Sequence, residues 1–118
     1  MNKFFRGFYF AAHGLLHTFR TQINFRVQVF AAVTVIGLSY YLGLDTGEWL
    51  WIALAITLVL TSELANTAVE KIVDLVSPGF NPKAGIIKDI FAGLVLISAI
   101  FALVVAIMIL LPKILYAP

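Results

Sequence analysis

Residues 49–76 read WLWIALAITLVLTSELANTAVEKIVDLV, and this stretch decides the fold. Its first part, residues 49–62, carries no charge, whereas the part from Glu63 onward carries several charged residues and no helix breaker. At 1.5 Å per residue, one helix over the whole stretch would be roughly 42 Å long. The hydrocarbon layer of a membrane is only about 30 Å thick. We therefore predict a helix that crosses the membrane and projects beyond it.

The rest of the chain also has a membrane composition. Of its 118 residues, 62% are hydrophobic and 12% are charged, and the mean hydropathy is +1.02. A water-soluble domain of this size needs more polar groups to cover its surface. Two further uncharged runs, residues 27–44 and 90–112, also suit the hydrocarbon layer. The sequence predicts an all-α membrane protein with three transmembrane helices, at about residues 25–44, 49–76 and 86–111.

Turn-forming residues separate the three predicted spans. Gly43, Asp45 and Gly47 end the first span. Ser77, Pro78, Gly79 and Pro82 end the second span, and Pro112 and Lys113 close the third.

An amphipathic surface helix is predicted at about residues 3–20. Its aromatic and aliphatic side chains cover most of the helical wheel, which is typical of a helix lying in the plane of the headgroups. We expect this segment to be retained, because it is too polar for the apolar core of a signal peptide. The basic and histidine residues that share its polar face are Lys3, Arg6, His13, His17 and Arg20.

The distribution of charge predicts the orientation in the membrane. Lys113 lies on one side with Asp45 and Glu48, and the positive-inside rule makes that side the outer one. The N-terminus is then cytoplasmic and the C-terminus is outside. A net charge of +2 predicts no nucleic-acid partner, and the absence of cysteine excludes disulfides and thiolate sites. The basic residues of the cytoplasmic side are Lys3, Arg6, Arg20, Arg26, Lys71, Lys83 and Lys88.

The charged part of the second span places its polar side chains on one face. At 100° per residue, Glu63, Asn66, Thr67, Glu70 and Asp74 fall within about 100° of one another. Two helical turns separate Glu63 from Glu70, about 10.5 Å, which suits the two ends of a phosphate group with its metal. An ionisable side chain in a membrane span is costly, so Glu63 is a candidate functional residue.

Two kinds of reaction would use a carboxylate at this position. A small oligomeric transporter would use Glu63 as a proton or cation exchange site, whereas a lipid-modifying enzyme would use it as a general base on a lipid hydroxyl. Lys88 and Asp89 open the third span at the same level, and basic residues of the surface helix lie nearby. Phosphoryl transfer requires such cations, together with Mg²⁺ held by carboxylates. The second reaction is favoured, although Asp74 and Lys71 fit a solvated helix extension equally well.

The run from Glu63 to Asp74 resembles the motif E-x-x-N-[ST]-A-[LIV]-E-x-x-V-D of the small prokaryotic diacylglycerol kinase family, which includes undecaprenol kinases. Lys88 and Asp89 match the K-D pair that follows it in the family. The resemblance implies one lipid kinase domain over residues 1–118, assembled as a homotrimer with active sites between neighbours. It also implies ATP as co-substrate, Mg²⁺, a membrane lipid as substrate, and a multi-pass location in the bacterial inner (cytoplasmic) membrane. No P-loop is implied, and the sequence contains none.

The resemblance assigns roles to individual residues. Glu63 would be the general base that deprotonates the lipid hydroxyl, and Asn66 would orient this base or the phosphate. Glu70 would hold the Mg²⁺ that bridges the ATP phosphates. The residues implied in nucleotide binding are Lys3, Glu70, Asp74, Lys88 and Asp89.

One residue departs from the family pattern. Family members usually carry a glutamate at the position of Gln22, where it shares the metal with the equivalent of Glu70. The glutamine offers a carbonyl oxygen but no charge, so the metal site would be weaker or differently assembled. Gln28 is not expected to replace it, because it lies nearly two turns further along.

The lipid substrate is diacylglycerol or undecaprenol by this resemblance. Residues 75–82 and 88–93 are more similar to the undecaprenol kinase branch than to the enterobacterial diacylglycerol kinase. Both lipids end in a primary alcohol, so the chemistry does not separate them.

Overall fold

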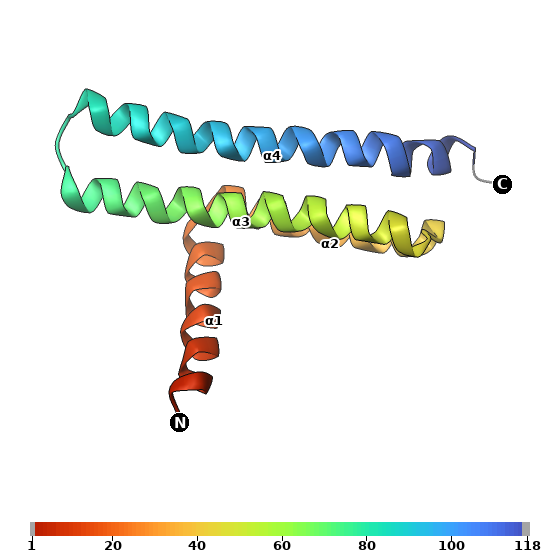
Figure 1. Ribbon diagram of the computed structural model, residues 1–118, viewed down its shortest axis with the longest axis horizontal. Helices are drawn as coiled ribbons and strands as arrows, with labels where there is room; N and C mark the ends of the chain where they lie inside the picture. Colours follow the sequence, from red (N-terminus) through yellow and green to blue (C-terminus); the bar gives the residue numbers. More distant parts are fainter. Residues whose placement is uncertain (1, 117–118) are drawn as a thin grey trace.

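The computed structural model describes residues 2–116, and within this range the chain forms four α-helices and no strand (Figure 1). Three of the helices are long and apolar enough to cross a membrane. The prediction of an all-α membrane protein with three spans is confirmed. The helices are α1 (Lys3–Thr21), α2 (Ile23–Leu42), α3 (Thr46–Val76) and α4 (Pro82–Leu115).

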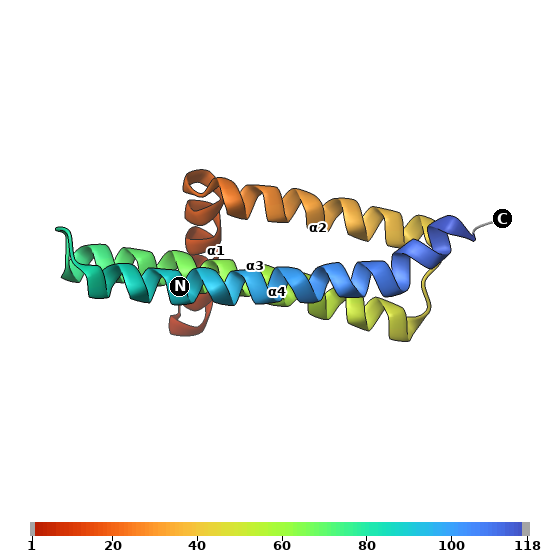
Figure 2. The same ribbon diagram turned by 90° about the horizontal axis from the view of Figure 1, so that it is seen from above.

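The three long helices form one elongated bundle. Helix α3 packs most extensively against α4 and next most against α2 (Figures 1 and 2). Helix α1 packs chiefly against α2 and runs away from the side of the bundle (Figure 1). If the bundle axis follows the membrane normal, α1 lies in the membrane plane, as its amphipathic sequence predicts.

The helix ends show why the chain turns where it does. Gly43 adopts a left-handed conformation with φ 72° and ends α2. Asp45 then caps α3 in a reciprocal capping box, because its side chain accepts from the Glu48 amide at 2.8 Å and the Glu48 side chain accepts from the Asp45 amide at 3.1 Å. Asn81 caps α4 in front of Pro82. The segments predicted as turns therefore separate the spans as expected.

Helix α4 extends past both ends of its predicted range, residues 86–111. Pro82 occupies the first turn, where a missing amide hydrogen costs no helical hydrogen bond. Pro112 was expected to close the helix, but it lies inside the last turn, and α4 bends near this end (Figure 2). The backbone amide of Tyr116 still donates to the Pro112 carbonyl at 2.9 Å. The other helix boundaries differ from the predicted ones by less than one turn.

The interior of the bundle differs between its two ends. Apolar side chains form the core near the α2–α3 turn, where Leu44, Ile52, Ala55, Val105 and Leu110 are buried together. Toward the α3–α4 loop the buried side chains are mostly polar, and the Ser62 and Ser98 hydroxyls join α3 to α4 at 2.8 Å. The polar interior therefore occupies the half of the bundle that ends at the α3–α4 loop.

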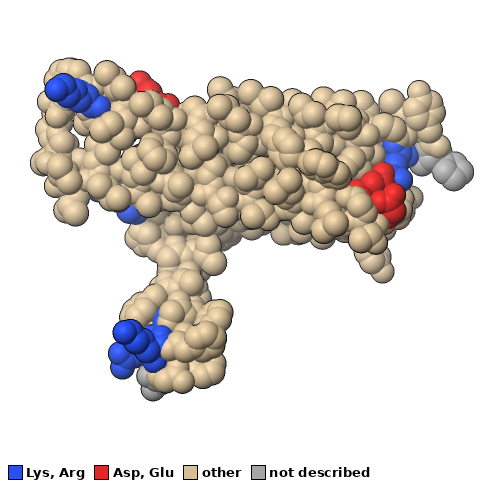
Figure 3. All heavy atoms as spheres, viewed as in Figure 1, with Lys and Arg blue, Asp and Glu red and all other residues tan. Residues whose placement is uncertain are grey.

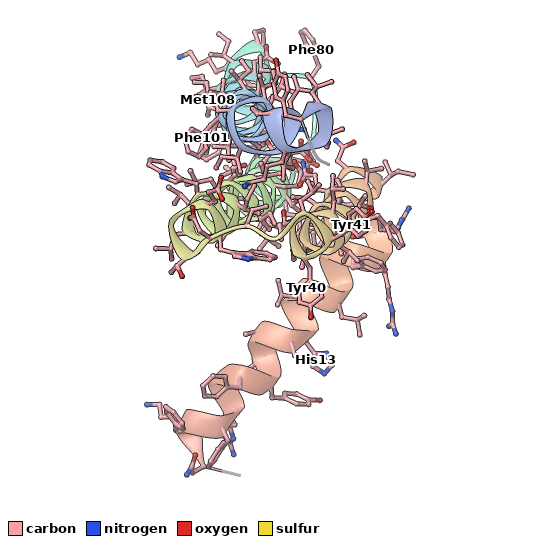
Figure 4. All side chains as sticks on the ribbon, turned by 90° about the vertical axis from the view of Figure 1, so that its right-hand side faces the viewer. His13, Tyr40, Tyr41, Phe80, Phe101 and Met108 are labelled. Atoms are coloured by element: carbon pink, nitrogen blue, oxygen red, sulfur yellow. The ribbon has the colours of Figure 1, made fainter. Side chains whose placement is uncertain are left out.

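Large apolar side chains cover the outside of the bundle. Phe30, Ile97 and Met108 are all exposed, and Figure 4 shows Tyr40 and Phe80 directed away from the helices around them. A water-soluble protein of this size would not expose so much apolar surface. Lipid or other protein chains therefore surround these faces.

Candidate active site

The polar face of α3 points into the bundle over its central part. Glu63 is 2% exposed, Asn66 8% and Thr67 4%, because this face packs against the neighbouring helices. Further along the same face Glu70 is half-buried and Asp74 is exposed. The predicted row of polar residues thus runs from a buried carboxylate to a solvated one.

Gln28 of α2 is the polar side chain that faces Glu63 across the bundle. Its amide lies beside the Glu63 carboxyl group. The Oε1 atom of Gln28 is buried without a hydrogen-bond partner in the described part of the chain, and the same holds for Oδ1 of Asn66. Two carbonyl oxygens that could accept a hydrogen bond therefore lie next to, or one turn from, the buried carboxylate.

Gln28 is not among the site residues predicted from the sequence, where it is considered only as a substitute for Gln22 in binding metal. The available signal was an uncharged polar side chain in the first turns of an otherwise apolar span, a position that is costly unless the side chain has a partner or a function.

Asn66 lies between Glu63 and Glu70 on the polar face of α3 and is hydrogen-bonded to Glu70. Its Nδ2 donates to Oε1 of Glu70 at 3.2 Å, across one helical turn. This bond orients the Glu70 carboxylate and leaves the Asn66 carbonyl oxygen unpartnered. The candidate metal ligand is therefore held by an amide side chain that lies one turn from the candidate base on the same helix.

Lys88 of α4 joins the row at its exposed end. Its Nζ donates to Oδ1 of Asp74 at 2.6 Å, and the two side chains are 38% and 66% exposed. Asp89 and Lys71 are exposed and form no ion pair within residues 2–116. Of the predicted nucleotide-binding residues, the structure brings Asp74 and Lys88 together.

The contact between Gln28 and Glu63 places α2 and α3 at the same height along the bundle axis at that point. The height of the other residues follows by counting along each helix. Helix α2 begins five residues before Gln28, so its junction with α1 lies about 7.5 Å nearer the α3–α4 loop than Glu63 does. By the same arithmetic Gln22 and Glu70 are at nearly the same level, about 9 and 10.5 Å from that of Glu63. Helices α3 and α4 extend past α1 (Figure 1). Glu70, Asp74 and Lys88 therefore belong to the level of α1 and the projecting end.

Lys3 lies far from this group within one chain. It begins α1, about 27 Å along the helix from Thr21. Figure 3 shows the basic side chains at the tip of α1 separated from the acidic and basic side chains of the bundle. Lys3 is therefore too far from Lys88 of the same chain for both side chains to reach one nucleotide.

Glu70 offers the type of ligand that a magnesium ion prefers, a carboxylate oxygen, but too few such ligands lie near it in the described chain to hold the ion. Mg²⁺ prefers oxygen ligands and is usually held by one or two carboxylates, with phosphate oxygens and water completing the shell. The half-buried Glu70 supplies a carboxylate. Within the described range, 2–116, no three His, Asp or Glu residues cluster closely enough to hold a metal by themselves. Such a site would be completed by nucleotide phosphate oxygens and water.

These features define an integral membrane protein with a polar site that starts inside the bundle and opens at the α3–α4 loop. Residues 9–110 match the model of a family described as prokaryotic diacylglycerol kinase. An undecaprenol kinase of Bacillus subtilis is 36% identical over 113 residues, covering 96% of this chain and 92% of that protein.

Two further relatives are diacylglycerol kinases. The Synechocystis protein is 41% identical over 109 residues, which cover 92% of this chain and 62% of the relative. The Helicobacter pylori protein is 32% identical over 99 residues, covering 84% of this chain and 77% of the relative.

The chain belongs to the prokaryotic diacylglycerol kinase family, which confirms the predicted resemblance. It is a lipid kinase of the membrane, so it uses ATP and acts on a membrane lipid. Family membership also decides between the two classes of protein considered, because a lipid kinase catalyses phosphoryl transfer and not ion exchange.

Proposed function

We propose that this kinase transfers the γ-phosphate of ATP to the primary hydroxyl of undecaprenol, with Glu63 as the general base. The observation that carries the proposal is the burial of Glu63, 2% exposed within a membrane span and beside Gln28. A carboxylate inside an apolar bundle is shielded from water, and an ionisable side chain held within a membrane span is costly enough to indicate a function there. Diacylglycerol is the other candidate lipid, because several relatives are named for it.

The proposed reaction is a direct displacement at phosphorus. The lipid hydroxyl oxygen attacks the γ-phosphorus and forms a new P–O bond, while the bond from the γ-phosphorus to the β–γ bridging oxygen breaks and ADP leaves. The Glu63 carboxylate takes the hydroxyl proton. Asn66 positions the Glu70 carboxylate through its 3.2 Å hydrogen bond, one turn from the base.

The nucleotide is proposed to bind at the projecting end of α3 and α4. Lys88 and Asp74 lie together there, with Asp89 next in sequence to Lys88. Glu70 and Gln22 would hold Mg²⁺, and their common axial level supports this assignment. When bound, the ion would neutralise charge on the phosphates.

We propose a homotrimer with shared active sites. The placement of Lys3 supports this, because it reaches a nucleotide only if α1 extends toward a neighbouring subunit. The large apolar faces of the bundle also leave room for other copies. Residues 1–118 would then form one kinase domain per subunit.

The proposed topology places the α3–α4 loop in the cytoplasm of a bacterium and the protein in its inner membrane. Lys71, Lys83 and Lys88 lie at this end of the bundle, whereas Lys113 is at the other end, paired with Glu48 at 3.3 Å. The positive-inside rule then makes the N-terminus cytoplasmic and the C-terminus external. ATP is available on the side where the site opens.

The test is a direct assay of the purified protein in mixed micelles with γ-labelled ATP and Mg²⁺. Undecaprenol and diacylglycerol are offered separately and together at equal mole fraction. Transfer of label to undecaprenol, with a higher kcat/KM than for diacylglycerol, supports the proposal. Transfer to diacylglycerol alone would contradict the undecaprenol assignment, and transfer to neither lipid would contradict the proposed reaction.

A further inference from the structure

A narrow apolar pocket of about 210 Å³ lies between α2, α3 and α4. It extends along residues 28–35 of α2, 52–60 of α3 and 99–106 of α4. Gln28 is the one polar residue among those that line it in the described part of the chain. The pocket is distinct from the charged row of α3, but Gln28 of α2 lines the pocket and also lies beside Glu63 of that row.

The pocket leads from the candidate base toward the middle of the membrane. Its lining extends about 10.5 Å along α2 and α4 and about 12 Å along α3. At one end Gln28 lies beside Glu63, and at the other end Val35 and Ile52 lie near the apolar core. A molecule filling this pocket would place a polar head at Gln28 and an apolar tail among the spans.

The volume and the lining of the pocket suit a segment of hydrocarbon chain. Small side chains from all three helices line it, including Ala32, Ala55 and Ala102. For scale, an apolar cavity of about 150 Å³ in another protein holds one benzene molecule. A pocket of about 210 Å³ therefore has room for a short segment of a hydrocarbon chain.

The apolar lining also favours one of the two candidate lipids, because they differ in the atoms next to the hydroxyl group. In a polyprenol the hydrocarbon chain starts at the carbon that carries the hydroxyl. In diacylglycerol the neighbouring carbons carry ester groups, whose oxygens would be buried against alanine and valine side chains without donors. Burying such polar groups unpaired costs roughly 1–3 kcal/mol each.

We propose that this pocket holds the first segment of a single-chain lipid alcohol and thereby selects a polyprenol over diacylglycerol. Gln28 acts as a positioning residue, because its unpartnered Oε1 can accept a hydrogen bond from the hydroxyl as the lipid enters. The hydroxyl then rotates its single proton from Gln28 to the neighbouring Glu63 carboxylate, which removes it. This inference rests on the proposed function of Glu63 as the base for a lipid hydroxyl. It adds the residues that choose the lipid.

The experiment narrows the pocket without touching the charged row. Ala102→Leu and Ala32→Leu each add bulk to the lining, and Ala53→Leu makes the same change at an exposed position of α3 outside the pocket. KM and kcat are measured for undecaprenol, diacylglycerol and ATP, and particle mass is measured by light scattering. Ala32→Val is a milder substitution for use if a leucine variant does not fold.

The wild-type enzyme is expected to show the higher kcat/KM with undecaprenol. Narrowing the pocket is expected to raise KM for undecaprenol, because less room is left for the lipid chain. For scale, one methylene more or less in an apolar pocket changes the ratio of kcat/KM between two substrates roughly 10–200-fold. KM for ATP and the particle mass stay unchanged, and Ala53→Leu behaves as the wild type. Gln28→Leu is expected to lower kcat for undecaprenol, whereas the pocket variants are expected to raise KM for undecaprenol. KM for ATP should change little in either case.

Three results would contradict the inference while leaving the kinase assignment intact. These are an unchanged undecaprenol KM in the pocket variants, a wild-type preference for diacylglycerol, and a change in particle mass without a change in KM. The last result would mean that a second copy of the chain fills the pocket. A wild-type enzyme that phosphorylates neither lipid would instead contradict the proposed function itself.

Discussion

The two ends of the three-helix bundle each carry a lysine–carboxylate ion pair between α3 and α4, and their surroundings differ. At the α2–α3 turn, Lys113 contacts Glu48 at 3.3 Å, and Glu48 also completes the capping box with Asp45. At the α3–α4 loop, Lys88 contacts Asp74 at 2.6 Å, and Asp74 continues the polar row of α3.

The difference lies in how many polar atoms have partners. At the turn end, each of the charged side chains Asp45, Glu48 and Lys113 takes part in a cap or an ion pair. In the half that ends at the loop, Gln28 and Asn66 retain buried oxygen atoms without partners among the described residues. Buried polar atoms without partners are costly, so their presence beside Glu63 indicates a site for a ligand rather than a structural brace.

Ser39 is an exception to this pattern. Its hydroxyl is completely buried near the α2–α3 turn and has no hydrogen-bond partner within residues 2–116. It is one neutral hydroxyl close to the end of α2, whereas the other half of the bundle combines two amides with a carboxylate. The contrast between the two ends therefore depends on Gln28, Asn66 and Glu63 together, and not on a single unpartnered atom.

Glu63→Gln is expected to have the largest effect. Removing the general base should lower kcat by roughly 10²–10⁴-fold, whereas nucleotide binding is largely kept because Glu70 lies two turns away. Initial rates and binding of a non-hydrolysable ATP analogue measure the two quantities separately. Near-native turnover in this variant would remove Glu63 from the chemistry.

Glu70→Gln is expected to impair the use of Mg·ATP. Loss of a residue that only supports a metal ligand commonly costs about 10–100-fold in affinity or activity, and loss of a ligand should cost at least as much. The measurement is KM for Mg·ATP and the Mg²⁺ concentration that gives half-maximal rate. If both keep their wild-type values, Glu70 does not hold the metal.

Gln22→Glu is expected to improve the metal site. A carboxylate at the level of Glu70 adds negative charge, and about 1 kcal/mol of extra attraction would lower the half-maximal Mg²⁺ concentration roughly fivefold. Gln22→Leu serves as the uncharged control of similar size. An unchanged or higher Mg²⁺ requirement in Gln22→Glu would exclude Gln22 from the site.

Glu48→Gln is expected to have the smallest effect, because it changes the turn end alone. It weakens the ion pair with Lys113, and partly exposed pairs contribute about 0–1 kcal/mol to the free energy of unfolding. Thermal unfolding in detergent should therefore shift only slightly, with kcat and KM unchanged. A large loss of kinase activity would show that the two ends of the bundle do not have separate roles.

Much of the site could be predicted from local sequence. Glu63, Asn66 and Glu70 share a helical face by periodicity alone, and the structure buries the first two and joins the last two by a hydrogen bond. Gln28 escaped prediction because its contact with Glu63 depends on how α2 and α3 slide and rotate against each other. Lys3, in contrast, was predicted to belong to the site but lies far from Lys88 within one chain. The reason is the direction in which α1 leaves the bundle, which the sequence of α1 does not specify.

The number of spans, the projecting end of α3 and the order of polar residues along it could all be predicted from the amino-acid sequence. These properties are local, because they depend on run length against membrane thickness and on 3.6 residues per turn. Three features became visible in the folded chain alone: the contact of Gln28 with Glu63, the pocket lined by alanines of three helices, and the continuation of α4 through Pro112. Each of these depends on side chains packing between separate helices or on a backbone that bends to accommodate proline, and no local pattern specifies either.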